Sequence, residues 1–308
     1  MNFTFHQLKV FSVVAEKKSV TKAAEELHMT QPAVSIQLKK LQDQFNIPLT
    51  EIIGRRLHIT DFGWELYGIA EKILNEVDTI TYRTESFSGL LSGKLKLAVV
   101  STGKYVMPYY LKQFLQEFPT VDLSMDVANR SRVIERLTNN EVDFALVSVL
   151  PKGTSVDQEI LMPNKLFLIG STDHKIAANQ TLNKSIFENI PLIFREEGSG
   201  TRQKMQQYFE KTHIHPTVKL ELTSTEAVKQ AVIAGLGFSI LSLASIRSEL
   251  LENDVKIIPV KGLPLRSEWR LIWLKQKKFS VVAKTYLDFL RKNKQLIYKN
   301  HFSWIEKY

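Results

Sequence analysis

The sequence contains no cysteine, which excludes disulfides, thiol nucleophiles and thiolate metal ligands. It also has no long apolar segment, because the most apolar uncharged run, residues 231–244, is interrupted by glycine and serine and is too short to cross a bilayer. The opening residues, MNFTFHQLKV, lack the basic stretch and apolar core of a secretion signal. We therefore expect a cytoplasmic protein in a reducing compartment, with no membrane partner.

The patterns of common catalytic and metal sites are missing or incomplete. The segment EGSG does not form the Gly-x-Ser-x-Gly motif of hydrolases, and there is no Walker loop with its lysine. Glu196 and Glu197 are adjacent and would point apart, so they suit shielding of the neighbouring arginines better than acid/base catalysis. His213 and His215 lack an evident third ligand. The sequence predicts no enzyme, no catalytic residue, no metal site and no cofactor.

The composition is that of an ordinary globular protein with a basic balance. The 308 residues are 44% hydrophobic and 24% charged, and this length favours two structural units. The formal net charge is +9, but residues 265–308 carry +8 and residues 1–60 only +3. The overall charge therefore does not by itself predict that the N-terminal part binds nucleic acid.

Residues 19–45 have the pattern of two short helices joined by a sharp turn. Ser19 is a good N-cap for the first helix, and Thr30 is one for the second, with Pro32 in its first turn. The apolar residues of the second helix share one face: Val34, Leu38, Leu41 and Phe45. Its polar residues share another: Gln31, Ser35, Lys39 and Gln42. An earlier helix should pack beneath this pair, through Phe5, Leu8, Phe11 and Val14.

The polar face of the second helix suits the major groove of DNA. Gln can pair with adenine edges, Ser with either base type, and Lys with guanine or phosphate. A short hairpin is predicted next, at residues 48–60, where Gly54 permits the bend and Arg55 and Arg56 could reach a phosphate or the minor groove. The alternative is an ordinary helix hairpin with a solvated outer face and a solvated arginine pair. Periodicity alone does not separate the two interpretations.

These segments resemble the winged helix-turn-helix of LysR-type transcriptional regulators, and the chain length is also similar. The resemblance rests on two runs: Ser19, Ala23, Ala24, Leu27, Gln31, Pro32, Ala33, Val34 and Ser35, and Leu57, His58, Ile59 and Thr60 followed by Gly63. The DNA-binding candidates are Ser19, Thr30, Gln31, Pro32, Ser35, Lys39, Arg55 and Arg56. The sequence departs from the family at Thr50, where Phe is usual, and at Ile52, where Arg is usual, so the resemblance does not carry over that wing contact.

Residues 61–87 predict one long helix, because Thr60 and Asp61 favour a helix N-terminus. Its apolar residues recur at steps of three and four: Phe62, Leu66, Ile69, Ile73, Val77 and Ile80. We expect this seam to meet the same helix of a second subunit, in a homodimer or homotetramer on a two-fold operator. The alternative is packing against its own chain. A hinge-like linker follows, with Ser88, Gly89, Ser92 and Gly93.

From residue 94 onward, apolar strands alternate with helices. The expected strands are 94–101, 121–128, 143–149, 165–171, 191–195, 218–223, 238–242, 255–260 and 270–275. The expected helices are 104–117, 130–139, 200–212, 224–235, 244–251 and 279–293. Alternation predicts parallel sheets, and crossovers near 162 and 262 predict two lobes. This resembles the periplasmic-binding-protein-like effector domain of the same family. The last residues, HFSWIEKY, are expected to be solvated and partly packed.

Ligands of open α/β sheets bind beyond the carboxyl ends of strands, beside helix N-termini. Polar and cationic side chains stand at four such junctions: Ser101, Thr102 and Lys104; Asn129 and Arg130; Arg195, Ser199, Thr201 and Arg202; Thr223 and Ser224. Converging donors of this kind suit a small anionic effector, a carboxylate or a phosphate ester. Each Ser or Thr taken alone is also explained as a plain N-cap.

Four segments resemble the branch of the LysR family that regulates Calvin-cycle (carbon-fixation) operons: VVSTGKYVMPYYL, VANR, FREEGSGTR and VKQAVIAGLGFSIL. This resemblance implies a phosphorylated metabolite or related small anion as effector. The leading hypothesis is a transcriptional regulator that binds double-stranded DNA at a promoter palindrome, with a carbon-metabolism operon as candidate target and RNA polymerase as candidate partner. The alternative is a cytoplasmic small-molecule-binding or transferase protein whose N-terminal helices serve dimerisation.

The expected architecture is an α+β multidomain chain. It comprises a winged helix-turn-helix at 1–60, a linker and dimerisation helix with hinge at 61–90, and a two-lobed α/β effector-binding domain at 91–308. Lobe I is expected at about 91–161 and 265–308, and lobe II at about 162–264.

Overall fold

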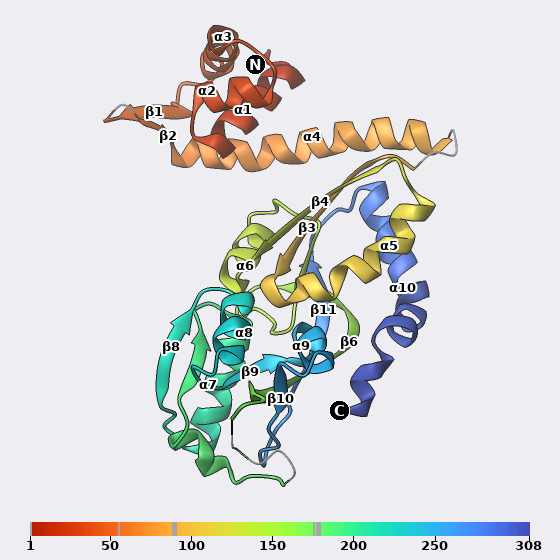
Figure 1. Cartoon of the computed structure of the whole chain (residues 1–308). Helices are drawn as coiled ribbons and strands as arrows, with labels where there is room; N and C mark the ends of the chain where they lie inside the picture. Colours follow the sequence, from red (N-terminus) through yellow and green to blue (C-terminus); the bar gives the residue numbers. More distant parts are fainter. Residues whose placement is uncertain (1, 55, 88–90, 175, 177–179) are drawn as a thin grey trace. The chain divides into compact units, whose positions relative to one another are not determined.

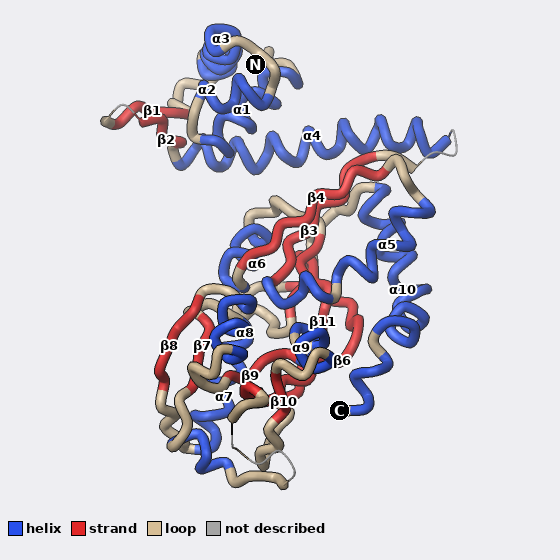
Figure 2. The backbone as a smooth tube through the Cα atoms, in the orientation of Figure 1, coloured by secondary structure: helices blue, strands red, loops and turns tan. Residues whose placement is uncertain are grey.

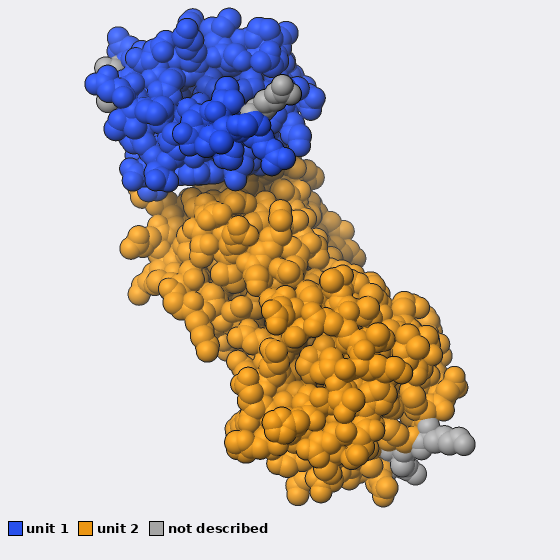
Figure 3. Space-filling model, turned by 90° about the vertical axis from the view of Figure 1, so that its left-hand side faces the viewer, with its two compact units in different colours: residues 1–90 blue, residues 91–308 orange. Residues whose placement is uncertain are grey.

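A computed structural model of the chain describes residues 2–54, 56–87, 91–174, 176 and 180–308. The chain forms two compact units, Met1–Leu90 (unit 1) and Leu91–Tyr308 (unit 2), which Figure 3 colours separately. Each unit has a hydrophobic core of its own. None of the described helices combines the length and the apolar character that a membrane span requires.

The described residues of unit 1 form four helices and a two-stranded hairpin: α1 (Phe5–Lys17), α2 (Val20–Glu26), α3 (Gln31–Gln42), β1 (Thr50–Ile53), β2 (Arg56–Ile59) and α4 (Asp61–Phe87). The predicted caps of α2 and α3 are confirmed. Ser19 Oγ accepts a hydrogen bond from the Lys22 N–H at 3.3 Å, and Thr30 Oγ1 accepts one from the Ala33 N–H at 3.4 Å. These caps fix where the two short helices begin.

Helix α1 contacts α2, α3 and α4 and therefore lies at the centre of unit 1 (Figure 1). The buried residues of α1 and α3 match the predicted apolar faces: Leu8, Phe11, Val14, Val34, Leu38 and Leu41. Phe5 differs from the prediction, because it lies in the first turn of α1 and its side chain is 59% exposed. Phe45 is half-buried and contacts the rings of Phe3 and Phe62.

Helix α4 divides the predicted apolar seam into two parts. Leu66 is buried, and Phe62 and Ile73 pack on the same core, because α1 presents its apolar face to this part of α4. The prediction that the whole seam meets a second subunit is therefore wrong for this part, which contacts its own chain. Trp64 and Ile69 remain exposed on α4. Some of the predicted positions lie outside the described side chains and residues: Ile80, Ser88 and Gly89.

Strands β1 and β2 form the predicted hairpin. They pair antiparallel from Thr50 opposite Ile59 to Ile53 opposite Arg56. Gly54 has a φ of +56°, a conformation that glycine adopts without strain. Arg55 lies outside the described residues. We call this hairpin the wing.

Unit 2 contains the alternating strands and helices that the sequence predicts. Its strands are β3 (Gly93–Val100), β4 (Val121–Ala128), β5 (Phe144–Val147), β6 (Val156–Ser171), β7 (Leu192–Arg195), β8 (Val218–Leu222), β9 (Ser239–Ser242), β10 (Val255–Ile257) and β11 (Leu265–Leu274). Its α-helices are α5 (Met107–Glu117), α6 (Arg130–Thr138), α7 (Gly200–Thr212), α8 (Thr225–Ile233), α9 (Arg247–Leu251) and α10 (Val281–His301). Short 3₁₀ turns include η1 (Ser101–Tyr105).

A mixed sheet runs through both halves of unit 2. Its strand order is β10-β6-β11-β5-β3-β4, with β9 also paired to β6, and a separate pair is formed by β7 and β8. The predicted parallel pairing is confirmed for β3, β4 and β5 and for β7 with β8. It is wrong for β6, β9, β10 and β11, which pair antiparallel. The reason is that β6 and β11 carry the chain between the halves in opposite directions.

The crossing strands are longer than predicted. Strand β6 begins at Val156 instead of residue 165, and β11 begins at Leu265 instead of residue 270. Polar residues and Pro163 obscure the strand pattern in the first half of β6. Cross-strand pairing with β11, from Leu166 opposite Leu265 onward, nevertheless holds that half in the sheet.

Helices cover the sheet of the first half on both sides. Figure 2 shows α5 and α10 on one side of β3 and β4 and α6 on the other. Helix α10 runs to His301, well beyond the predicted end at 293. Phe302 and Ile305 are buried, so the C-terminal segment packs on the core more than the sequence suggests. The second half has its own apolar cluster, which includes Leu166, Phe187, Phe194, Phe209 and Phe238.

A close approach of two backbone segments joins the wing to α4. Thr60 Oγ1 accepts from the Gly63 N–H at 3.0 Å and donates to the Pro48 carbonyl at 2.6 Å. A Cβ at Gly63 would lie 2.2 Å from the Leu49 carbonyl oxygen and 2.7 Å from an Ile59 methyl. Both neighbours are fixed by the hairpin and its loop. Only glycine fits at this position of the helix.

We predict that Gly63→Ala destabilises unit 1 by about 1–3 kcal/mol, because the added methyl overpacks against backbone. The same substitution at an ordinary exposed helical glycine stabilises the protein, because alanine favours the helix by about 1 kcal/mol relative to glycine. Gly68→Ala is the matched control, because nothing lies within 4 Å of its added Cβ. Hydrogen exchange of full-length protein should be faster across α1–α3 for Gly63→Ala, and equal or slower for Gly68→Ala. Equal protection of both variants would contradict the packing argument.

Candidate functional site

Helix α3 presents a polar face opposite its buried side. Gln31 and Lys39 are exposed and Ser35 is half-buried, and Gln31 Nε2 donates to Ser35 Oγ at 3.3 Å. These are the donors and acceptors that base edges and phosphates require. Gln42 does not extend this face, because its amide bonds with the backbone of Ile47 and Leu49.

The remaining predicted DNA-binding residues surround α3 or belong to the wing. Ser19 and Thr30 use their oxygens as helix caps, and their hydroxyl hydrogens can still be donated. Pro32 is exposed at the start of α3, and Arg56 is exposed at the start of β2. The structure thus places every described member of the predicted set on the surface of unit 1, outside its hydrophobic core.

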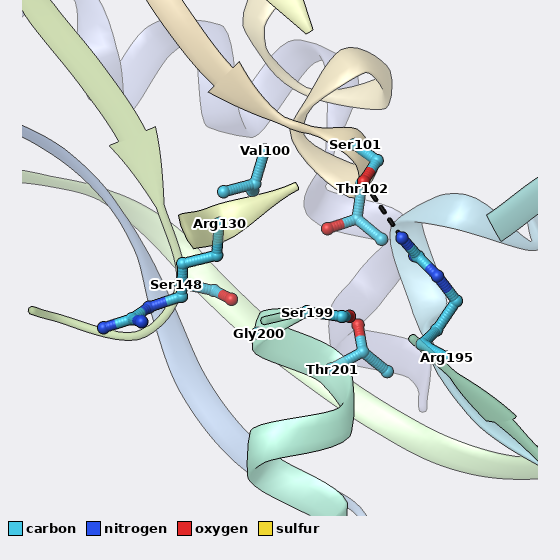
Figure 4. A pocket seen from close by; sticks show the side chains of 9 residues that line it. All are labelled: Val100, Ser101, Thr102, Arg130, Ser148, Arg195, Ser199, Gly200 and Thr201. Carbon is cyan, nitrogen blue, oxygen red and sulfur yellow. Dashed lines mark hydrogen bonds between the residues drawn. The ribbon is translucent and has the colours of Figure 1, made fainter. Parts of the chain in front are cut away.

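A polar pocket lies between the two halves of unit 2 (Figure 4). We call it the inter-lobe pocket. It is lined by Val100, Ser101, Thr102, Arg130, Ser148, Arg195, Ser199, Gly200 and Thr201. These residues lie at or just after the carboxyl ends of β3, β5 and β7 or at the starts of α6 and α7, where ligands of α/β sheets bind.

Arg195 is the buried cation beside this pocket. Its side chain is 1% exposed, and its Nε lies 2.8 Å from the Glu196 carboxylate. Its other nitrogens donate to Thr225 Oγ1 at 2.6 Å and to Ser101 Oγ at 3.2 Å. The last bond joins β7 of one half to η1 of the other. The predicted shielding of an arginine by Glu196 is therefore confirmed.

The N-terminus of α7 supplies further donors. Its first N–H groups have no partner within the helix, which makes the end of a helix attractive to anions. Ser199 is the N-cap residue, but its side chain makes no capping hydrogen bond and lines the pocket instead. Gly200, the first residue of α7, also lines the pocket. Hydroxyls and N–H groups thus converge around one small volume.

Arg130 lines the pocket with its alkyl stem only. Its Nε donates to the Val149 carbonyl at 3.0 Å and its Nη2 to the Leu150 carbonyl at 2.8 Å. Figure 4 shows the guanidinium turned away from Ser101. Burial lowers the pKa of this guanidinium, although it remains charged at neutral pH. The positive group is therefore engaged elsewhere and does not face the pocket as the sequence suggested.

Lys104 joins an ion cluster beside the pocket instead of lining it. Its Nζ lies 3.0 Å from Glu226 on α8, and Lys229 Nζ lies 2.9 Å from the same side chain. Tyr105 also donates to this carboxylate. Burial alone would raise the pKa of Glu226, but the hydrogen bonds from Tyr105, Lys229 and Lys104 lower it to about 2. The carboxylate is thus ionised at neutral pH, and the cluster ties η1 to α8.

Four other predicted effector residues lie away from the pocket lining. Asn129 and Ser224 cap α6 and α8, accepting from the N–H groups of Arg132 and Ala227. Arg202 pairs with Glu221. Thr223 is exposed.

Sequence reasoning missed two polar residues at the site. Ser148 lines the pocket, but it fell inside a predicted strand that in fact ends at Val147. Thr225, 2% exposed, accepts from Arg195, but it follows a stronger N-cap candidate in the sequence. The rule that polar residues follow strand ends would have identified Ser148 had the end of β5 been placed correctly.

The inter-lobe pocket is nearly closed. Its cavity volume is about 10 Å³, which is room for about one water molecule. A ligand larger than a water molecule therefore needs more room than this volume offers. Among the described residues, no group of three His, Asp or Glu lies close enough to hold a metal ion. The chemistry on offer is hydrogen bonding and charge, which suits reversible binding of an anion.

Known protein families match both parts of the chain. The family model described as "Bacterial regulatory helix-turn-helix protein, lysR family" matches residues 5–64, and the model described as "LysR substrate binding domain" matches residues 88–295. The HTH-type transcriptional activator CmpR of Synechocystis sp. is 38% identical over 94% of this chain and 95% of its own length. A RuBisCO operon transcriptional regulator of Acidithiobacillus ferrooxidans is 35% identical over 93% of each chain.

A solved structure is similar to the second unit. It is the CcmR regulatory domain of Synechocystis PCC6803 in complex with 2-PG. It is 33% identical, covers 66% of this chain and 98% of its own, and has a TM-score of 0.64. Together with the two family models and the near full-length relatives, these matches show that the chain belongs to the LysR family of bacterial helix-turn-helix transcriptional regulators.

Proposed function

We propose that this LysR-family regulator binds a promoter palindrome of a carbon-metabolism operon, and that a small phosphorylated anion in the inter-lobe pocket controls that binding. The observation that carries the proposal is the convergence of hydroxyls from Ser101, Ser199 and Thr201 on the α7 N-terminus, beside the buried Arg195. The names of the relatives support the operon class. The 2-PG complex of CcmR supports the anion, 2-phosphoglycolate. The alternative of a transferase is not favoured, because the helix-turn-helix model matches residues 5–64.

In this proposal the chain acts in the cytoplasm as a dimer or tetramer on its DNA target. Residues 1–60 bind DNA, residues 61–90 join subunits, and residues 91–308 bind the effector. The exposed Trp64 and Ile69 of α4 are apolar surface that a second subunit could cover. RNA polymerase is a further proposed partner of the DNA-bound assembly.

The proposed DNA contacts come from α3 and the wing. Gln31, Ser35 and Lys39 would reach the major groove, with Ser19, Thr30 and Pro32 at its edge. Arg56 and Arg55 would contact phosphates or the minor groove. Gln and Ser carry sequence information through base edges, whereas a lysine on phosphate adds affinity for any DNA. The two kinds of residue can therefore be separated by experiment.

We predict that Gln31→Ala weakens binding to the upstream intergenic DNA by about 5- to 100-fold, because one bidentate base contact discriminates by about 1–3 kcal/mol. Binding to scrambled DNA of equal length should change little. Lys9→Ala is a control, because Lys9 is exposed on α1 and is not among the predicted DNA-binding residues. Fluorescence anisotropy at near-physiological salt measures both DNAs. Equal affinity of wild-type protein for both would refute sequence-specific binding.

The inter-lobe pocket generates a prediction of its own. Ser101→Ala should weaken 2-phosphoglycolate binding by about tenfold or more, because it removes a hydroxyl beside both the anion and Arg195. Isothermal titration calorimetry on full-length protein measures the affinity. Ser124→Ala is the matched control, since Ser124 is exposed on β4 and does not line the pocket.

Two outcomes separate the parts of this proposal. If wild-type protein does not bind 2-phosphoglycolate but binds another sugar phosphate or short carboxylate with the same dependence on Ser101, the site is right and the effector is wrong. If the Ser101 and Ser124 variants bind equally well, the site itself is wrong.

A further inference from the structure

Helix α3 carries one large apolar side chain on its exposed side, Ile36, which the proposed DNA contacts do not use. This side chain is 53% exposed, whereas Val34 and Leu38, two residues before and two after it, are buried. Residues two apart on a helix point to nearly opposite sides. Ile36 therefore lies in the middle of the solvent side of α3, and it does not belong to the hydrophobic cluster that the described residues of unit 1 form.

The neighbours of Ile36 on the helix surface are exposed residues one turn away in each direction. Pro32 lies four residues before it, and Lys39 and Lys40 lie three and four residues after it. Neither lysine forms an ion pair with a described residue. The sequence from residue 27 to residue 42 contains no acidic residue. Both ammonium groups therefore remain available for phosphates, on either side of the line that Ile36 would take into a groove.

An isolated exposed isoleucine needs no explanation on an ordinary surface. Ile36 differs because α3 is the second helix of the pair that the helix-turn-helix family model matches. The other exposed side chains of α3 include the amide of Gln31 and the two ammonium groups, which suit base edges and phosphates. The position of Ile36 among these groups calls for a feature of DNA that an apolar side chain can recognise.

The major groove offers one such feature. Isoleucine has no donor or acceptor in its side chain, so it cannot read the hydrogen-bonding pattern of a base edge. The apolar group that distinguishes one base in the major groove is the C5-methyl group of thymine. A cytosine at the same place lacks this methyl group and presents an amino donor instead. Contact between the two apolar groups would remove both from water and favour thymine over cytosine.

We propose that Ile36 is a specificity-determining residue that packs on the C5-methyl group of a thymine in the major groove. Lys39 and Lys40 hold the adjacent DNA backbone, and Ile36 selects the base. This inference rests on the proposed function, because it takes α3 as the helix that enters the groove.

The test removes the methyl group from the DNA and the side chain from the protein, separately and together. In the upstream intergenic DNA, thymines are replaced one at a time by deoxyuridine, which keeps the base pairing and lacks only the methyl group. Fluorescence anisotropy of full-length wild-type protein should show about 3- to 10-fold weaker binding for one thymine of a half-site, because about one buried methyl group is lost. For Ile36→Ala the loss at that position should be less than about twofold, because the shorter side chain does not cover the methyl group.

Ile47→Ala is the matched control. Ile47 is also 53% exposed, but it lies outside α3 and is not among the predicted DNA-binding residues. This variant should keep the full wild-type response to deoxyuridine. Alanine favours a helix more than isoleucine does, so Ile36→Ala is expected to fold. Sedimentation without DNA should give the same assembly for Ile36→Ala as for wild-type protein. A smaller assembly would assign Ile36 to a subunit contact and overturn the proposal.

The anisotropy results separate failure of this inference from failure of the proposed function. Equal binding of wild-type protein to upstream and scrambled DNA would overturn both. Selective binding that no deoxyuridine weakens would overturn the inference alone. A loss of the same size in wild-type protein and Ile36→Ala would also overturn it, since another residue would then contact the methyl group.

Discussion

The antiparallel pairing of β6 with β11 is the constraint on which the rest of unit 2 depends. The two strands are paired from Leu166 opposite Leu265 to Val156 opposite Leu274, so the chain leaves and re-enters the first half at one place. The parallel strands β3 and β5 continue the sheet on one side, and β9 and β10 pair with β6 on the other. Because the halves share this ladder, the pairing of β6 with β11 fixes how they face each other across the inter-lobe pocket.

Charge compensation explains how the inter-lobe pocket can hold a buried arginine without a ligand. Removing a guanidinium from water is costly unless hydrogen bonds and an opposite charge replace its hydration. Glu196 provides the charge, and Thr225 and Ser101 provide the bonds. An arriving anion therefore adds to a satisfied network, or displaces Ser101 from it. Displacement of Ser101 would alter the contact between η1 and β7 and would thereby couple binding of the proposed anion to the arrangement of the halves.

The sequence contained most of the local structure but little of its tertiary context. The caps Ser19 and Thr30 and the apolar face of α3 are set by neighbours within a few residues, so they were predictable. The apolar seam of α4 has the same sequence pattern whether it packs on α1 or on another subunit. The partner of this seam could therefore not be predicted from the sequence. Lys104 lies after the end of a strand, as a ligand-binding residue would. Its ion pair with Glu226 could not be predicted, because the two residues are far apart in the sequence and meet only in the folded chain. Ser148 was missed because the predicted strand ended at residue 149, whereas β5 ends at Val147.

The inter-lobe pocket balances most of its own charge, and this balance bears on what it can select. Glu196 offsets Arg195, and the guanidinium of Arg130 bonds to the Val149 and Leu150 carbonyls. The groups that remain for a ligand are the hydroxyls of Ser101, Ser199 and Thr201 and the first N–H groups of α7. Selection by the proposed site would therefore depend on the fit of a compact anion to these donors more than on net charge.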